Sequence, residues 1–401
     1  MTKLTPAAKK AFLIGGMCSM SYLAVYIARN ILGAVTPQML EGGSFTTESI
    51  GTLSSVYFIS YAVGQLINGR IGDRIKAKYM ISFGLILAGV CNLLFSVMSH
   101  SPMAEYVCYA LSGFFLSMIY GPMTKVVAEN TESLYTVRCS MGYEFASLLG
   151  SPLAGVLAAL LLWQFVFAAS GAALILMGSL CFFVFSVFEK KGIIQYNQYK
   201  APENRSGSLR LLLQHRIVKF TLISILTGVI RTSVVFWMPT YISQYLSFSS
   251  GDAALIFTIS SFVISLTTFI AIFIYERLGR NMDLTILLSF CTSALCFLFL
   301  FLVKQPVLNI IFLVLAIMAS NSAATMLWSR YCPSLRDTGM VSSATGFLDF
   351  VSYMAAAASS SLFANAVADI GWGNLILIWF GLMVLGIAVS LPYKKGLKMH
   401  M

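Results

Sequence analysis

The chain has 401 residues, of which 58% are hydrophobic and 10% are charged, and its mean hydropathy is +0.83. This composition excludes an ordinary soluble domain and predicts a protein that crosses the lipid bilayer many times. The net charge of +11 is not a signature of nucleic-acid binding, since no soluble domain exists to carry a basic patch.

Long apolar runs along the chain predict twelve transmembrane helices and no membrane strands, because a barrel would show short alternating segments. Spans of about 20 residues at 1.5 Å rise match a hydrocarbon core of roughly 30 Å. The predicted helices cover residues 11–38, 47–69, 78–98, 102–128, 137–162, 164–188, 215–246, 253–275, 284–303, 306–330, 338–362 and 373–393.

A polar stretch rich in Lys, Arg, Ser and Pro divides the apolar sequence near its middle. We therefore predict an all-α membrane protein with two pseudo-symmetric six-helix bundles, at residues 1–188 and 215–401, joined by a cytoplasmic linker at 189–214. The first apolar run is too long for a cleavable signal peptide, so we expect it to remain as the first helix.

The basic residues indicate the orientation in the membrane. Of the 26 Lys and Arg, Arg29 and Arg231 lie within predicted helices and Lys304 lies alone on one side, whereas the others lie at the opposite side. The positive-inside rule then places both termini in the cytoplasm. We expect the protein to reside in the inner cell membrane.

Arg29 and Arg231 interrupt apolar runs at matching places in the two halves, 202 residues apart, and each precedes a proline by eight residues. A charge near the bilayer centre costs about 2.5 to 3.5 kcal/mol, so two retained arginines indicate a task at that depth. Guanidinium groups offer paired donors that fit the oxygens of a phosphate or carboxylate. These residues therefore predict an anion site, and a structural pairing with buried acids is the alternative.

Tyr22 and Tyr26 share a helical face with Arg29 because their spacings are four and three residues. A tyrosine there can donate a hydrogen bond to an anion while its ring packs against apolar neighbours. Packing between helices, or a place in the aromatic belt at the membrane interface, is the alternative for both.

The second predicted helix carries a polar stripe at spacings of four, four and three residues: Tyr57, Tyr61, Gln65 and Asn68. Such a face favours the lining of a cavity over contact with lipid. For Tyr57 and Asn68, close helix packing explains the pattern equally well.

Two acids lie in predicted spans. Asp349 either neutralises an arginine in the empty site, binds a substrate hydroxyl or amine, carries a coupling proton, or forms a structural pair. Glu144 is a second candidate for proton coupling, and a pairing with Arg138 or with the loop at Asp73 and Arg74 is its alternative.

Cofactor chemistry is not indicated. The eight cysteines form no CxxC, and the three histidines are far apart, so we expect neither a metal site nor structural disulfides. There is no GxxxxGK[ST] loop for ATP. We expect no catalytic residues and no cofactor, hence no enzyme.

Four glycines predict close approach of helix backbones: Gly113, Gly121, Gly150 and Gly155.

Two motifs resemble a known superfamily. Residues 69–78 (GRIGDRIKAK) look like the cytoplasmic signature of the major facilitator superfamily, and residues 275–280 (YERLGR) resemble its second copy. The resemblance implies two six-helix halves with a site near the membrane midplane. Asp73 and Arg74 would then belong to a cytoplasmic gate, and a simple topology signal is the alternative.

A narrower resemblance covers the first helix of each half. The chain is similar there to the organophosphate:phosphate antiporter family, through Tyr22, Tyr26, Arg29, Pro37, Arg231, Trp237, Pro239, Thr240 and Tyr241. The resemblance implies a transporter that exchanges a phosphate ester or phosphonate for inorganic phosphate. It also implies that Arg29 and Arg231 flank the phosphate and that Tyr61 lies in the site. We expect the protein to be a monomer.

The chain departs from the pattern of that family at several positions. Asn30 and Gln65 stand where those transporters commonly carry lysines, and Asp349 stands where glycine would be expected. The predicted site has therefore lost positive charge, which favours a smaller, less charged or differently shaped anion. Two rival interpretations remain open: a proton-coupled carboxylate symporter that uses Asp349 and Glu144, and a membrane sensor for a phosphorylated ligand.

Overall fold

The computed structural model describes residues 5–43, 45–72, 75–98, 102–196, 213, 215–335 and 341–391, and every regular element within these ranges is helical. The elements are α1 (Pro6–Glu41), α2 (Thr47–Gly72), α3 (Ala77–Val97), α4 (Pro102–Leu116), α5 (Tyr120–Asn130), α6 (Ser133–Leu160), α7 (Trp163–Lys190), α9 (Ile217–Gly228), η1 (Val229–Val234), α10 (Val235–Gln244), α11 (Ser250–Ser265), α12 (Thr267–Arg277), α13 (Met282–Leu302), α14 (Pro306–Met326), η2 (Leu327–Tyr331), α15 (Cys332–Ser334) and α16 (Val341–Ser390). The predicted all-α membrane class is confirmed.

Ten helices in the described part of the chain are long and apolar enough to cross a bilayer. The sequence predicts twelve spans, and the two counts differ at two places. The helix predicted at 137–162 corresponds to α6, whose described apolar stretch is the shorter Leu149–Leu160. The helices predicted at 338–362 and 373–393 are joined in α16, which is interrupted at Gly371 with φ 74° and ψ 169°. Twelve spans remain a prediction.

Several predicted helices are interrupted and consist of shorter helical segments. The span predicted at 102–128 breaks between α4 and α5, where Asn68 donates a hydrogen bond to the Ser117 hydroxyl at 2.8 Å. The span predicted at 215–246 consists of α9, the π-helical turn η1 and α10. A second π-helical turn, η2, follows α14. In a π-helical turn the backbone bonds join residues five apart, which makes room for one extra residue.

The chain forms two compact units. Unit 1 contains Met1–Phe45, Val56–Glu203 and Ser250–Thr258, and unit 2 contains Thr46–Ser55, Asn204–Ser249 and Ile259–Met401. The predicted linker lies mostly outside the described residues.

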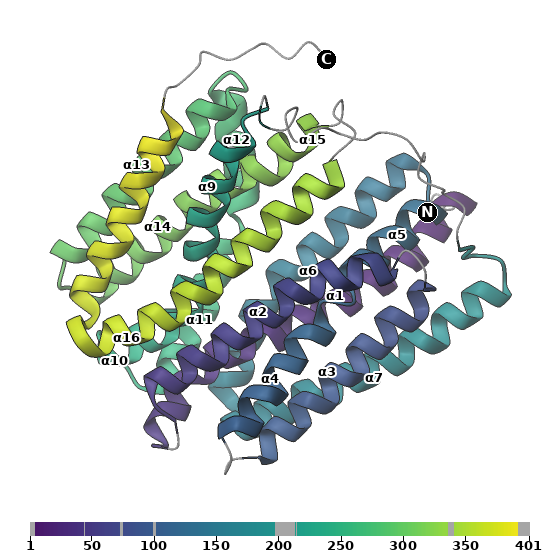
Figure 1. Cartoon of the computed structure of the whole chain (residues 1–401), viewed down its shortest axis with the longest axis horizontal. Coiled ribbons are helices and arrows are strands. Elements are labelled where there is room, and N and C mark those ends of the chain that lie inside the picture. The colour runs from purple at the N-terminus through teal and green to yellow at the C-terminus, as the bar shows by residue number, and fades with distance from the viewer. Residues whose placement is uncertain are drawn as a thin grey trace. The chain divides into compact units, whose positions relative to one another are not determined.

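In unit 1, α1 packs along α6 and α3 packs along α7 (Figure 1). Glycines allow the second pair to approach closely: a Cβ added to Gly89 would lie 2.7 Å from the carbonyl oxygen of Gly171, and the reverse holds for Gly171. At the helix ends, Glu189 binds the ammonium groups of Lys76 and Lys78. The hydrogen bond to Glu189 raises the pKa of Lys76, so this exposed ammonium stays charged.

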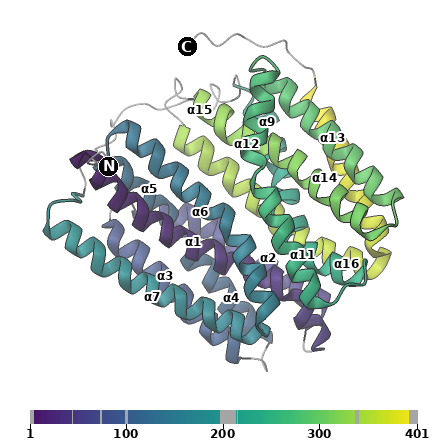
Figure 2. The same ribbon diagram turned by 180° about the vertical axis from the view of Figure 1, so that it is seen from behind.

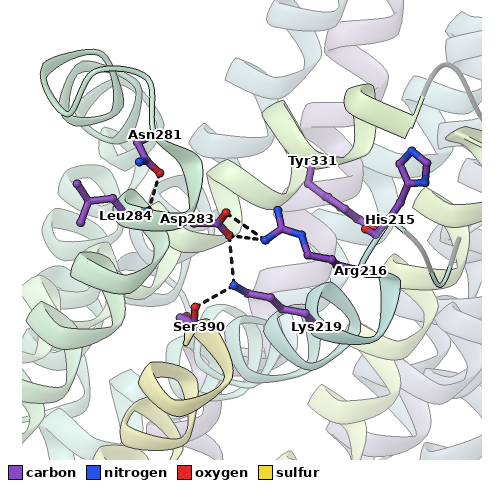
Figure 3. Close-up of polar contacts among 8 residues, drawn as sticks. All are labelled: His215, Arg216, Lys219, Asn281, Asp283, Leu284, Tyr331 and Ser390. Carbon is purple, nitrogen blue, oxygen red and sulfur yellow. Dashed lines mark hydrogen bonds and ion pairs between the residues drawn. The ribbon is translucent and has the colours of Figure 1, made fainter. Parts of the chain in front are cut away.

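In unit 2, α13 packs against α14 and α16, and α9 packs against α16 (Figure 2). An ionic cluster joins the ends of three of these helices (Figure 3). Asp283, in the first turn of α13, accepts from Arg216 at 3.1 Å through both oxygens and from Lys219 at 3.2 Å. Lys219 also donates to the carbonyl oxygen of Ser390, at the last residue of α16, at 2.8 Å.

Candidate functional site

Arg29 of unit 1 is half-buried on α1 and is surrounded by aromatic rings. Its guanidinium carbon lies 5.2 Å from the ring centroid of Tyr61, 5.3 Å from Tyr26 and 5.8 Å from Phe58. Tyr26 comes from the same helix and the other two rings come from α2. These cation-π contacts stabilise the guanidinium within the span without neutralising its charge. Phe58 was not predicted as a site residue.

Tyr22 lies next to Tyr26 but belongs to a group of four tyrosines. Its ring centroid is 4.9 Å from Tyr26, 5.5 Å from Tyr120 and 6.1 Å from Tyr143. The last two rings come from α5 and α6. The sequence analysis missed Tyr120 and Tyr143, because helical spacing relates only residues on one helix.

The remaining predicted residues of α1 and α2 lie in different surroundings. Tyr57 stacks on Tyr109 with centroids 4.9 Å apart and is 1% exposed, an arrangement that favours the packing interpretation. Asn30 donates to the backbone carbonyl of Tyr26 at 2.6 Å. Gln65 is half-buried on α2.

Gly150 of α6 supports the backbone of α1 close to Arg29. A Cβ at Gly150 would lie 2.7 Å from the carbonyl carbon of Tyr26 and 3.0 Å from its oxygen. Gly113 and Gly155 likewise adjoin backbone atoms of neighbouring helices, as predicted. The same prediction is wrong for Gly121, where an added Cβ meets nothing within 4 Å because the residue is exposed on α5.

We expect Gly150→Ala to lower the thermal unfolding midpoint and to weaken anion binding. The added methyl group must push α1 away at Tyr26, and such overpacking costs about 1 to 3 kcal/mol. Thermal unfolding of the purified protein, with and without phosphate, measures both effects. Gly121→Ala is the matched control and should unfold at the same temperature as the wild type or higher. Equal midpoints for the two variants would contradict the close contact.

Arg231 of unit 2 lies in η1 and is half-buried. Its guanidinium carbon is 6.0 Å from the ring centroid of Trp328, which lies in η2. Trp328 is a candidate that the sequence analysis missed. Two aromatic residues of α10 that carry the family resemblance instead bind neighbouring helices: Trp237 donates to the carbonyl oxygen of Ser360, and Tyr241 donates to Asn309.

Asp349 is half-buried on α16. Burial raises the pKa of the Cys332 thiol in α15, and the negative charge of Asp349 contributes in the same direction. The roles predicted for Asp349 stay predictions.

Three predicted residues cannot be placed. Asp73 and Arg74 lie outside the described residues, as does the side chain of Glu144. The cytoplasmic gate and the second proton-coupling candidate therefore remain predictions.

Comparison with known proteins identifies the family. Residues 18–360 match the Major Facilitator Superfamily. The chain belongs to this superfamily. Solved structures share its fold: the xylose transporter XylE from E. coli superposes with a TM-score of 0.76 at 12% identity, covering 98% of this chain and 100% of that one. The nucleoside transporter NupG superposes with a TM-score of 0.75 at 15% identity, covering 96% of this chain and 100% of that one.

Curated relatives match over shorter stretches. The Membrane sensor protein UhpC of Salmonella typhimurium is 35% identical over 96 residues, which are 24% of this chain and 22% of that protein. The Glycerol-3-phosphate transporter of Bacillus subtilis is 22% identical over 258 residues, which are 58% of this chain and 57% of that protein. The chain thus spans less than a quarter of the first relative and just over half of the second. Membership of the superfamily and the apolar helices indicate an integral membrane protein, as the sequence predicts.

Proposed function

We propose that this protein is a secondary active transporter that exchanges a small phosphate ester or phosphonate for inorganic phosphate by alternating access. The observation that carries the proposal is Arg29, whose guanidinium lies among the rings of Tyr26, Phe58 and Tyr61 inside a membrane span. Aromatic faces stabilise the cation without neutralising its charge. We propose that Arg29 binds the anionic group of the substrate.

A second arginine in the other unit supports the proposal. Arg231 occupies the position that corresponds to Arg29 and also lies beside an aromatic ring. Neither guanidinium can lose its proton to escape the low dielectric, and each presents two parallel donors to phosphate oxygens. We propose that both arginines bind the phosphate group.

The names of the relatives favour a phosphorylated substrate, since they include a glycerol-3-phosphate transporter and a probable hexose phosphate transport protein of Chlamydia trachomatis. Asn30 and Gln65 are uncharged, which favours a less charged substrate than two further lysines would bind. We also propose that the protein works as a monomer in the inner membrane, with both termini in the cytoplasm.

Exchange follows from the same charges. We propose that the protein crosses only when an anion is bound, because the anion compensates the charge of the arginines that bind it. A carrier with this property couples inward movement of one anion to outward movement of another.

Reconstituted vesicles provide the test. We expect internal inorganic phosphate to stimulate uptake of labelled glycerol 3-phosphate, hexose 6-phosphate or a small phosphonate, compared with phosphate-free vesicles. If internal phosphate stimulates uptake of no such compound, the exchange proposal fails. Carboxylate uptake driven by a pH gradient would instead identify a proton symporter, and ligand binding without any uptake would identify a sensor.

A further inference from the structure

The segment that carries Arg231 is held against α16 by a ladder of close contacts. Four positions from α9 to α10 meet four positions on α16. On the first segment they are Ser224, Gly228, Ser233 and Trp237. On α16 they are Leu348, Ser352, Ala356 and Ser360.

The two contacts on the α9 side of the ladder are close. Ser224 donates to the carbonyl oxygen of Leu348 at 2.8 Å. One turn later, a Cβ on Gly228 would lie 2.9 Å from the carbonyl oxygen of Ser352, so only glycine fits without displacing α16. Both residues are fully buried or nearly so, which fixes the register of α9 on α16.

The two contacts beyond the π-helical turn are hydrogen bonds. Ser233 donates to the carbonyl oxygen of Ala356 at 2.9 Å, and its hydroxyl lies 2.6 Å from that of Ser359. Trp237 donates through its indole nitrogen to the carbonyl oxygen of Ser360 at 3.3 Å. The ladder therefore continues on both sides of η1.

The spacings on the two sides of the ladder differ by one residue. On α16 successive contacts are always four residues apart, whereas on the other segment the spacings are four, five and four. The extra residue falls within η1, between Gly228 and Ser233. An α-helix turns by about 100° per residue, so four residues of a regular helix turn by about 400°. Here five residues share this rotation, which leaves about 80° for each.

This difference determines where Arg231 points. In a regular helix a residue three positions after Gly228 would lie on the same side as Gly228, beside α16. The smaller rotation in η1 moves Arg231 roughly 60° away from that side. Its guanidinium then meets Trp328, at 6.0 Å from the ring centroid.

We propose that the extra residue of η1 and the ring of Trp328 together fix the direction of the Arg231 side chain. Trp328 is then a positioning residue for anion binding. This inference rests on the proposed function of Arg231. The guanidinium carbon lies over the ring, and this contact restricts the directions that the guanidinium donors can take toward the anion. Trp328 acts through the arginine and needs no contact with the substrate.

The first experiment replaces the ring. We expect Trp328→Leu to raise the KM for glycerol 3-phosphate about tenfold at nearly unchanged maximal rate, as the loss of a partly desolvated cation-π contact does. Trp328→Phe retains an aromatic face and should stay within about threefold of the wild type. Wild-type KM in Trp328→Leu, or no rescue by phenylalanine, would overturn the positioning role.

The second experiment removes the extra residue. Deletion of Thr232 restores the four-residue spacing and keeps the ladder, so we expect an unchanged unfolding midpoint and a loss of affinity of at least about tenfold. Thr232→Ala is the matched control, because it removes the side chain and keeps the register. A deletion variant that binds phosphate like the wild type would overturn the inference.

A third measurement needs no substrate, and its first comparison does not use the deletion variant. Arg231→Leu should shift the tryptophan emission of the ligand-free protein, and the shift should vanish in a Trp328→Phe background. The Thr232 deletion should reproduce the shift, whereas Thr232→Ala should not. Absence of the shift in Arg231→Leu overturns the contact. If the wild type binds no phosphorylated compound but these shifts appear, the proposed function fails and the aiming of Arg231 stands.

Discussion

Exchange transport should fall at least about 100-fold in Arg29→Lys and in Arg231→Lys, although both variants keep the positive charge. An ammonium group is a compact point charge and cannot present two parallel donors to a phosphate. A loss of 100-fold corresponds to roughly 2.7 kcal/mol of transition-state stabilisation. Counterflow of labelled phosphate in reconstituted vesicles measures it, with membrane expression as the check on folding.

Arg330 offers a matched control for these substitutions. It lies in η2, and its guanidinium carbon is 4.7 Å from the ring centroid of Tyr275. Arg330 thus also lies on an aromatic face, but we do not propose that it binds the anion. Arg330→Lys should transport nearly as fast as the wild type. Retained exchange in Arg29→Lys and Arg231→Lys would remove the basis for a phosphate site.

The second large effect concerns stability. Asp283→Ala should destabilise unit 2 by about 2 to 3 kcal/mol, because it leaves Arg216 and Lys219 without their shared carboxylate. The side chain of Asp283 is 10% exposed, while that of Arg216 is 40% exposed, so solvent screening keeps the loss below that of a fully buried pair. Arg216 also adopts a left-handed conformation with φ 60°, which its two bonds to Asp283 help to hold.

Thermal unfolding of the purified protein measures this loss. Glu189→Ala is the control in unit 1, because Glu189 also binds two lysines but is 26% exposed beside a 47% exposed Lys76. Its unfolding midpoint should change less than that of Asp283→Ala. A larger drop in the Glu189 variant would show that burial does not determine the importance of these clusters.

The sequence predicts the fold class well because apolar runs reflect the bilayer directly. It also predicts Tyr26 and Tyr61 as partners of the site around Arg29, the first through helical spacing and the second through family resemblance. Trp328, Tyr120 and Tyr143 could not be found in this way. They reach their neighbours from other helices, and hydropathy does not show which helices meet.

The break between α4 and α5 has a local signal that the sequence analysis did not use. Gly121 and Pro122 lie in the first turn of α5, and Pro122 has no N–H to donate to the carbonyl oxygen of Met118. Pro37, by contrast, lies inside the uninterrupted α1. The π-helical turn at Arg231 has no such signal, since the apolar residues on both sides of it continue without change. One-residue insertions of this kind become visible only when two helices are aligned in space.

The contact between Gly89 and Gly171 has a mechanical consequence. At these two glycines the backbones of α3 and α7 are in direct contact, with no side chain of either residue between them. Sliding of one helix along the other would therefore bring peptide groups into steric conflict. We therefore expect α3 and α7 to move together as one rigid body. Bending during a transport cycle is then left to the joints where helical hydrogen bonding is interrupted, such as the short segment between α4 and α5.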